Sequence, residues 1–230
     1  MPLERVFLVK GSSNEIHRRI VKLAKQQGVP VKLVPLEKLQ RLTRKNHQGV
    51  VAFSSPVEFH HLETLLPQLF EQGKMPFIVV LDGVTDVRNF GAIARSAECF
   101  GVDAILISMH HSAPINGEAV KSSAGALLRI PVCRTNDLVR SLNFLSESGL
   151  RLVGATEKAA RAYHDVDYNL PYALVMGAED TGLSDEVWDR CDAHIKIPMA
   201  GLTASLNVSV AAGIIICEAA QQRLAASQTL

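Results

Sequence analysis

Short, mostly apolar segments recur along residues 77–197, and they constrain the fold of this chain more than any other feature. Polar stretches long enough to form helices separate them. Strands without regular polar alternation are typical of a parallel sheet that helices cover on both faces. The sequence therefore predicts an α/β fold with parallel strands at Phe77–Leu81, Ala104–Ser108, Pro131–Arg134, Arg151–Ala155, Ala173–Met176 and His194–Ile197. The helices are expected near Asn89–Phe100, Asn116–Leu127, Asn136–Ser148, Ser184–Asp189 and Ser205–Leu224.

The first 70 residues show the same alternation on a smaller scale. We expect strands at Arg5–Val9, Val31–Val34 and Gly49–Phe53, and helices near Asn14–Gln27, Leu36–Leu42 and His60–Phe70. The stretch 71–76, which contains Gly73 and Pro76, is the expected linker. The predicted domains are therefore a small α/β domain at 1–70 and a larger α/β domain at 77–230.

Positive charge is concentrated at the start of the chain. Residues 1–48 contain eleven Lys and Arg residues against three Glu residues, a net charge of +8, whereas the whole chain of 230 residues carries only +1. Because phosphate contacts by Lys and Arg dominate the affinity of proteins for nucleic acid, this asymmetry favours a nucleic-acid-binding first domain. A solvated surface that is basic without such a role is the alternative, and charge alone does not decide between them.

Several common enzyme signatures are absent from the sequence. No GxGxxG follows a predicted strand, and neither HExxH nor GxSxG occurs. Gly177–Gly182 has the glycine spacing of a phosphate loop, but Leu183 and Ser184 stand where that loop needs Lys and then Ser or Thr. These absences argue against a Rossmann dinucleotide site, a zinc protease, a serine hydrolase and a Walker-type nucleotidase.

The cysteines and the apolar runs indicate the cellular compartment. Four cysteines are scattered without a CxxC pair, which suits reduced thiols and offers no metal site; they are Cys99, Cys133, Cys191 and Cys217. The start of the chain lacks the pattern of a secretory signal. The longest apolar runs, Phe77–Leu81 and Ala211–Cys217, are too short to cross a bilayer. We therefore expect a cytoplasmic protein with no membrane association and no metal.

Three segments place polar residues directly after an apolar strand, where ligands bind in open α/β sheets. In the first, residues 80–101, Asn89 is suited to cap a helix that Gly101 ends. Arg95 points away from the apolar face of this helix, so it is free to bind a phosphate. A capped helix with a solvated arginine is the alternative, and this segment alone favours it.

The second segment, residues 173–183, runs from a strand into an acidic loop between Gly177 and Gly182. Glycine allows the backbone to approach a ligand closely. A tight turn with a solvated Glu179 is the alternative, and the segment in isolation favours that alternative.

The third segment, residues 197–213, opens an almost wholly apolar helix with Ser205 and Asn207. Such a helix must be buried, so these polar side chains need partners near the protein interior. Capping the helix would satisfy Ser205 but does not obviously satisfy Asn207. This segment is therefore the strongest single sign of a functional site.

In this order, the three segments resemble the SpoU/TrmH family of RNA 2′-O-ribose methyltransferases, and most closely its branch that methylates a guanosine of 23S ribosomal RNA. The spacing of six from Asn89 to Arg95 and the sequence IPMAG…SLNVSVA, which ends at Ala211, carry the likeness over essentially the whole chain. The resemblance implies a parallel-sheet catalytic domain with a C-terminal trefoil knot, a rare exception to the rule against knots. It also implies a small N-terminal α/β RNA-binding domain similar to ribosomal protein L30e.

The resemblance further implies the methyl donor and the residues around it. S-adenosyl-L-methionine would lie between the loops Met176–Gly182 and Ile197–Leu206. The cofactor-binding residues implied are Thr156, Met176, Gly177, Ile197, Met199 and Leu206, and the catalytic residues implied are Asn89, Arg95, Glu179, Ser205 and Asn207. Arg95 would bind the target phosphate or act as general base, Asn89 would orient the ribose, and Glu179 would hold the cofactor loop or Arg95.

The family works as a homodimer, so Asn89 and Arg95 are expected to reach a cofactor held by the partner subunit. The expected partners are RNA, with 23S ribosomal RNA first, and a second copy of the chain. A transfer RNA methyltransferase is the alternative substrate class, and a silent RNA-binding factor in ribosome assembly is the alternative function. The separate basic domain favours a structured ribosomal target, and the intact polar residues favour an enzyme.

Overall fold

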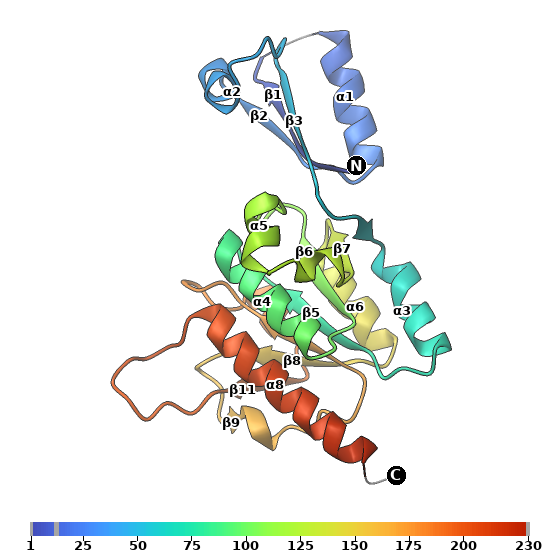
Figure 1. The fold of residues 1–230 in the computed structure, drawn as a ribbon, viewed down its shortest axis with the longest axis vertical. Coiled ribbons are helices and arrows are strands. Elements are labelled where there is room, and N and C mark those ends of the chain that lie inside the picture. Colours follow the sequence, from blue (N-terminus) through green and yellow to red (C-terminus); the bar gives the residue numbers. More distant parts are fainter. Residues whose placement is uncertain (1, 12–13, 229–230) are drawn as a thin grey trace. The chain divides into compact units, whose positions relative to one another are not determined.

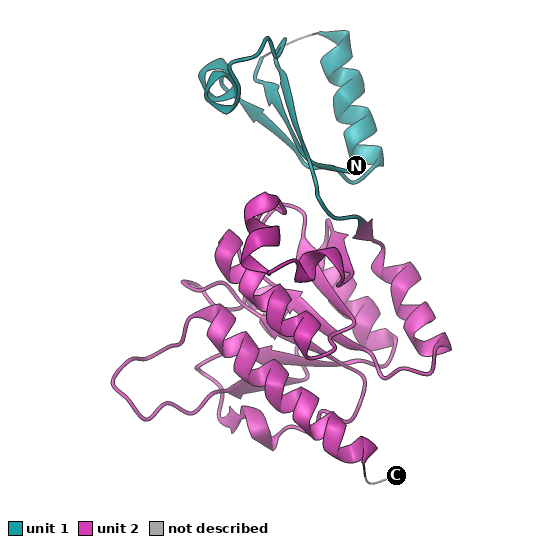
Figure 2. Ribbon diagram, viewed as in Figure 1, with its two compact units in different colours: residues 1–58 teal, residues 59–230 magenta. Residues whose placement is uncertain are grey.

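The computed structural model describes residues 2–11 and 14–228, which form two compact units within residues 1–58 and 59–230 (Figure 2). Each unit has its own sheet and its own hydrophobic core. None of the described helices is both long enough and apolar enough to reach across a bilayer.

The smaller unit is a three-stranded sheet between two helices (Figure 1). Its strands have the order β2-β1-β3, with β2 parallel and β3 antiparallel to β1. Alternate residues of a strand point to opposite faces, so Val6 and Leu8 join the core under α1, while Phe7 joins the core under α2. The elements are β1 (Leu3–Val9), α1 (Glu15–Gln26), β2 (Val31–Val34), α2 (Leu36–Leu42) and β3 (Val50–Ser54).

The larger unit is built on an eight-stranded sheet in the order β4-β7-β6-β5-β10-β8-β11-β9, and all neighbouring strands pair in parallel. Every residue of β5 and β10 is buried, because helices cover both faces. The predicted parallel α/β fold is thereby confirmed. The strands are β4 (Phe59–His60), β5 (Phe77–Leu81), β6 (Ala104–Ser108), β7 (Val132–Thr135), β8 (Arg151–Ala155), β9 (Arg161–Ala162), β10 (Tyr172–Met176) and β11 (Ala193–Lys196).

Helices cover the two faces of this sheet in separate groups. On one face, α3 (Leu62–Glu71) and α6 (Leu138–Glu147) share a core with alternate residues of β5. On the other face, α4 (Val87–Cys99) and α8 (Val208–Ser227) lie side by side (Figure 1). The shorter helical elements are α5 (Gly117–Ser122), η1 (Ala126–Leu128), η2 (Tyr163–Asp165) and α7 (Asp185–Trp188).

The division between the units falls after Glu58, ahead of the linker expected at 71–76. The reason is the position of α3, whose Leu62, Leu66 and Leu69 are buried in one core with Ile78 of β5. An amphipathic helix needs an apolar surface to cover, and α3 covers the larger sheet. The helix expected to close the first domain therefore belongs to the larger unit.

The helix expected at 116–127 is interrupted after Ser122. Ala124 and Gly125 both have positive φ, 50° and 82°, and a right-handed helix cannot continue through that conformation. The chain resumes as η1, which begins at Ala126. Two short helical elements consequently replace the single helix of the prediction.

Arg223 ties the end of α8 to the beginning of the sheet. Its guanidinium donates hydrogen bonds to the carbonyl oxygens of Met75 and Leu170 at 2.8 and 2.7 Å, and to those of Pro76 and Tyr168 at 3.4 and 2.9 Å. Burial lowers the pKa of Arg223. This one side chain therefore satisfies four main-chain acceptors in the larger unit.

Candidate active site

The carboxyl ends of β8, β10 and β11 open onto a cavity that is partly open to solvent. Its walls come from the segments that follow these strands and from the start of α8. All six residues expected to bind the methyl donor line it, namely Thr156, Met176, Gly177, Ile197, Met199 and Leu206. Glu179 and Ser205 from the expected catalytic set line it as well. The structure therefore brings two distant loops to one site.

The loop after β10 is held in shape by its own backbone. Ala178 and Gly182 exchange two main-chain hydrogen bonds of 3.0 and 2.9 Å, which close the loop on itself. A Cβ atom on Gly177 would lie 2.2 Å from the carbonyl carbon of Gly182. The expected reason for this glycine was close approach to a ligand, whereas the structure shows that the returning loop occupies the space of its side chain.

Asp82, which the sequence reasoning did not single out, fixes the far end of that loop. Its carboxylate oxygen Oδ2 accepts a hydrogen bond of 2.8 Å from the backbone N–H of Ser184. Its own N–H donates to the carbonyl oxygen of Met176 at 2.8 Å. The available signal was its position, since Asp82 is the first residue after β5.

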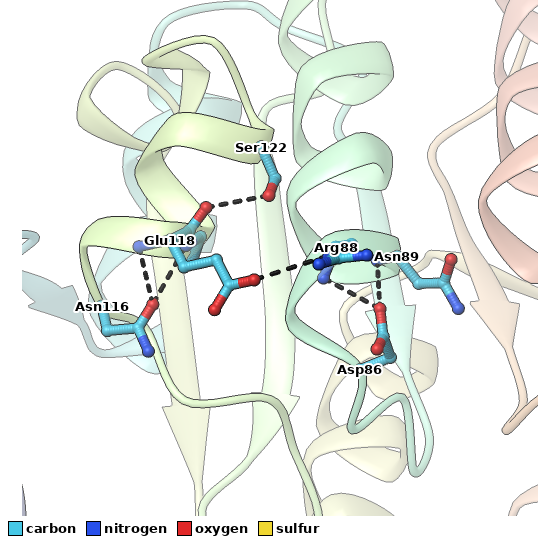
Figure 3. A network of polar contacts seen from close by, with 7 residues as sticks. Asp86, Arg88, Asn89, Asn116, Glu118 and Ser122 are labelled. Atoms are coloured by element: carbon cyan, nitrogen blue, oxygen red, sulfur yellow. Dashed lines mark hydrogen bonds and ion pairs between the residues drawn. The ribbon is translucent and has the colours of Figure 1, made fainter.

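Asn89 does not cap α4 as expected. Asp86 is the capping residue, and its Oδ1 accepts hydrogen bonds from the N–H groups of Arg88 and Asn89 at 2.9 and 2.8 Å (Figure 3). Asn89 therefore lies in the first turn of the helix, and its side chain points away from the ion pair between Arg88 and Glu118 (Figure 3). This arrangement leaves the Asn89 amide available for contacts across the site.

The third segment is corrected in a similar way. The helix α8 begins at Val208 and Asn207 caps it, with Oδ1 accepting from the N–H and the hydroxyl of Ser209 at 3.0 and 2.6 Å. Asn207 and Ser205 are both exposed, so neither is a buried polar group in search of a partner. Asn207 was expected to be unsatisfied by capping, but capping is what its oxygen does.

Asn89, Glu179 and Asn207 form a closed set of hydrogen bonds. Asn89 Nδ2 donates to Glu179 Oε2 at 3.0 Å, and Asn207 Nδ2 donates to Glu179 Oε1 at 3.2 Å and to Asn89 Oδ1 at 2.9 Å. The three side chains come from α4, the loop after β10 and the start of α8. Because both carboxylate oxygens accept from an amide, the Glu179 carboxylate sets the orientation of both asparagines.

In this chain Asn89 contacts Glu179 and Asn207 of the same chain, and its expected reach across a dimer stays a prediction. Arg95 is different. It is exposed on α4, does not line the cavity, and has no hydrogen-bond or ion-pair partner anywhere in residues 2–11 and 14–228. One chain thus assembles every expected site residue except Arg95.

The remaining side chains limit the chemistry that the larger unit can perform. Burial raises the pKa of the Cys133 and Cys191 thiols to about 12, so neither supplies a thiolate nucleophile near neutral pH. Within the described part of the chain, no three His, Cys, Asp or Glu side chains are grouped to hold a metal ion.

Comparison with known families gives one match for each of the two units of the chain. The family described as SpoU rRNA methylase matches residues 76–217, and the family described as RNA 2′-O ribose methyltransferase substrate binding matches residues 1–60. A relative from Bacillus subtilis, YacO, named as a TrmH family tRNA/rRNA methyltransferase, is 37% identical over 96% of this chain and 89% of its own length. A similarly named relative from Staphylococcus aureus is 34% identical over 96% of this chain and 90% of its own.

Solved structures show the same similarity. The SpoU methyltransferase AviRb of Streptomyces viridochromogenes, in complex with AdoMet, superposes with a TM-score of 0.65 at 25% identity, covering 97% of this chain and 84% of its own. An AdoMet-bound rRNA methyltransferase of Sinorhizobium meliloti superposes with a TM-score of 0.65 at 26% identity, covering 95% of this chain and 80% of its own. The A. aeolicus TrmH/SpoU tRNA modifying enzyme superposes with a TM-score of 0.61 at 32% identity, covering 71% of this chain and 86% of its own.

Proposed function

The chain belongs to the SpoU/TrmH family of S-adenosylmethionine-dependent RNA methyltransferases, and we propose that it methylates the ribose 2′-hydroxyl of a guanosine in 23S ribosomal RNA. One observation carries the proposal. The six residues expected to bind the donor line one cavity, and that cavity borders the hydrogen-bonded set of Asn89, Glu179 and Asn207. Donor and acceptor sites of this kind must be adjacent for a methyl group to pass between them.

The residues of the cavity suit S-adenosylmethionine. The cavity is concave, and apolar side chains line much of it beside a few polar groups, as in most small-molecule sites. Met176, Ile197, Met199 and Leu206 offer apolar contacts for an adenine ring, while the glycine-flanked loop at 177–182 offers main-chain N–H and C=O groups. When bound, S-adenosylmethionine supplies a methyl group already activated by a sulfonium, so the protein has to align the acceptor hydroxyl and assist loss of its proton.

Each polar residue then has a defined task. Glu179 holds the two amides in place, and Asn89 orients the ribose with hydrogen bonds to its hydroxyl groups. Ser205 lines the cavity and, with Asn207, orders the loop before α8. Arg95 binds the target phosphate, for which a guanidinium is geometrically suited. Because arginine stays protonated near neutral pH, we assign it this anchoring task rather than that of general base.

We infer that the active form is a homodimer in which Arg95 binds the target RNA beside the donor held by the partner subunit. Two observations support this inference: Arg95 lies outside the cavity of its own chain, and it is exposed without a partner among the described residues. The proposal also includes a trefoil knot formed by the loops 176–182 and 197–206, and a cytoplasmic location, which four free cysteines favour.

Ribosomal RNA is preferred over transfer RNA for a specific reason. The chain has a separate basic unit in addition to the methyltransferase domain, and residues 1–60 match a substrate-binding family. A separate recognition unit suits a large, structured target. Transfer RNA is the second candidate, because the A. aeolicus TrmH/SpoU tRNA modifying enzyme resembles 71% of the chain.

Mapping of 2′-O-methyl groups in total RNA tests the substrate. Cells with the gene, without it, and with the gene restored are compared nucleotide by nucleotide. The proposal expects one 23S position that loses its methyl group on deletion and regains it on restoration. Loss at a transfer RNA position would support the second candidate, and an unchanged methylation map would support a silent assembly factor.

A further inference from the structure

One face of the sheet in the smaller unit is only partly covered by a helix. Phe7, Val9, Val34 and Val51 point to this face and form a core with Leu39 of α2. The covered residues thus lie toward the carboxyl end of β1. At the amino end of β1, α2 contributes no residue to such a core.

Strand register places two cations and an aromatic ring at the uncovered end. Lys32 is paired with Phe7, and Arg5 is paired with Phe53. Paired residues of neighbouring strands point to the same face, and so do residues two apart in one strand. Arg5, Lys32 and Phe53 therefore share the face of Phe7.

The cations at this end lack negative partners. Lys32 lies close enough to Arg5 and to Lys38 of α2 for their charges to lower the pKa of Lys32, with Arg5 as the larger cause. None of the three side chains has an ion pair or hydrogen bond with any residue that the structure describes. The Nε of Arg5 is buried, again with no acceptor among those residues. Like charges held together repel each other, and a bound phosphate relieves that repulsion.

Phe53 offers a flat apolar surface beside these charges. Its side chain is 41% exposed, although it belongs to a strand. The ring of Phe7 contacts it edge-on, with centroids 5.8 Å apart and planes at 78°. This contact fixes the orientation of Phe53 while part of its surface stays open. Positive charge beside an exposed, fixed aromatic ring is the arrangement by which proteins bind single-stranded nucleic acid.

We propose that Arg5, Lys32, Lys38 and Phe53 form a surface that binds an unpaired segment of the substrate RNA. One base stacks on Phe53, and the neighbouring phosphates contact the three cations. The segment is unpaired because bases inside a duplex are stacked on each other and cannot reach a protein ring. The inference rests on the proposed function and adds where on the smaller unit the RNA lies and in what form.

Fluorescence anisotropy with the full chain tests this surface. The probes are a labelled oligouridine of about ten nucleotides and a duplex of the same length. F53A is expected to weaken binding of the single strand by roughly 5- to 150-fold, and F53W to retain it. K32Q is expected to weaken binding and to reduce the slope of log Kd against log salt by about 0.7. L23A and K25A, exposed positions on α1, are the matched controls and should bind as the wild type does.

The outcomes separate this inference from the proposed function. Wild-type affinity in both F53A and K32Q would overturn the surface, while methylation of 23S RNA by wild-type protein would leave the proposed function standing. An F53W protein as weak as F53A would overturn stacking in particular. Loss of fold in F53A would show in its thermal melt. The affinity of F53W for the single strand would then decide whether residue 53 stacks on a base. A wild-type chain that binds neither probe and methylates no RNA would remove both proposals.

Discussion

Asn207 Nδ2 donates a hydrogen bond of 2.9 Å to Asn89 Oδ1 across 118 residues of sequence. The contact joins the start of α8 to the first turn of α4, and Glu179 accepts from both amides. The Oδ1 of Asn207 meanwhile caps α8. Asn207 therefore has a structural oxygen and a site-facing nitrogen, and the two can be tested separately.

The variant N207D keeps the helix cap and removes the site-facing donor. Asp caps helices about as well as Asn, so the melting temperature should change little. The new carboxylate faces Glu179 instead of donating to it, so methyl transfer should fall about tenfold or more, equivalent to about 1.4 kcal/mol or more. Thermal melts and single-turnover methylation measure the two effects. N116D, at the corresponding cap of α5, is the control and should leave both unchanged.

Arg95 is expected to bind the RNA that accepts the methyl group and not to bind S-adenosylmethionine. R95A should reduce methyl transfer by about 100-fold or more, as removal of a single charge-stabilising donor does, while S-adenosylmethionine affinity in calorimetry stays the same. R88A on the same helix loses only an exposed ion pair of 3.5 Å and should react normally. Near-normal turnover of R95A would exclude Arg95 from the reaction.

The R95K variant distinguishes anchoring from proton removal. Lysine still carries a positive charge, but it lacks the bidentate geometry of arginine. If Arg95 anchors phosphate, R95K keeps partial activity with the wild-type dependence of rate on pH. A pH–rate profile displaced in R95K would instead indicate that residue 95 titrates during catalysis.

Gly177 should tolerate no side chain. In G177A the new Cβ would lie 2.2 Å from the Gly182 carbonyl carbon, so the loop must open to relieve the clash. We expect S-adenosylmethionine to bind at least about tenfold more weakly, because Gly177, Ala178, Glu179 and Gly182 of this loop border the cavity. G117A, where a Cβ meets nothing within 4 Å, is the control, and equal affinity in the two variants would count against the account.

Arg223 should matter for stability more than for chemistry. R223A leaves four carbonyl oxygens without their donor, so the free energy of unfolding should fall by about 3 kcal/mol. Urea unfolding followed by circular dichroism measures it. Arg190 is exposed, so the free energy of unfolding of R190A should differ from that of the wild type by less than about 0.5 kcal/mol. A loss in R223A no larger than that of R190A would show that these hydrogen bonds are dispensable.

Local sequence pattern was sufficient for six of the eight strands of the larger sheet, but not for the two-residue strands β4 and β9. Phe77–Leu81 and Ala104–Ser108 form strands with the predicted bounds, because buried apolar runs between polar stretches leave few other structures. The helix starts were less well predicted. Asp86 and Asn89 are both good capping residues. Asp86 caps the helix, while the Asn89 side chain donates to Glu179, which lies 90 residues away in the chain.

The site shows the same limit. The motifs identified the residues around the cavity, but periodicity cannot tell that α3 covers the larger sheet or that Asn207 meets Asn89. Such contacts are decided by packing between segments far apart in sequence. Asp82 was missed for a related reason, since its role depends on a loop that returns from beyond β10.

A crystal structure with S-adenosylhomocysteine, the product left after methyl transfer, tests the central claim most directly. The account predicts that the product occupies the cavity between 176–182 and 197–206, with its adenine against Met176, Ile197 and Leu206 and its sulfur facing Asn89. A cavity left empty at saturating product, or product bound elsewhere on the chain, would contradict it.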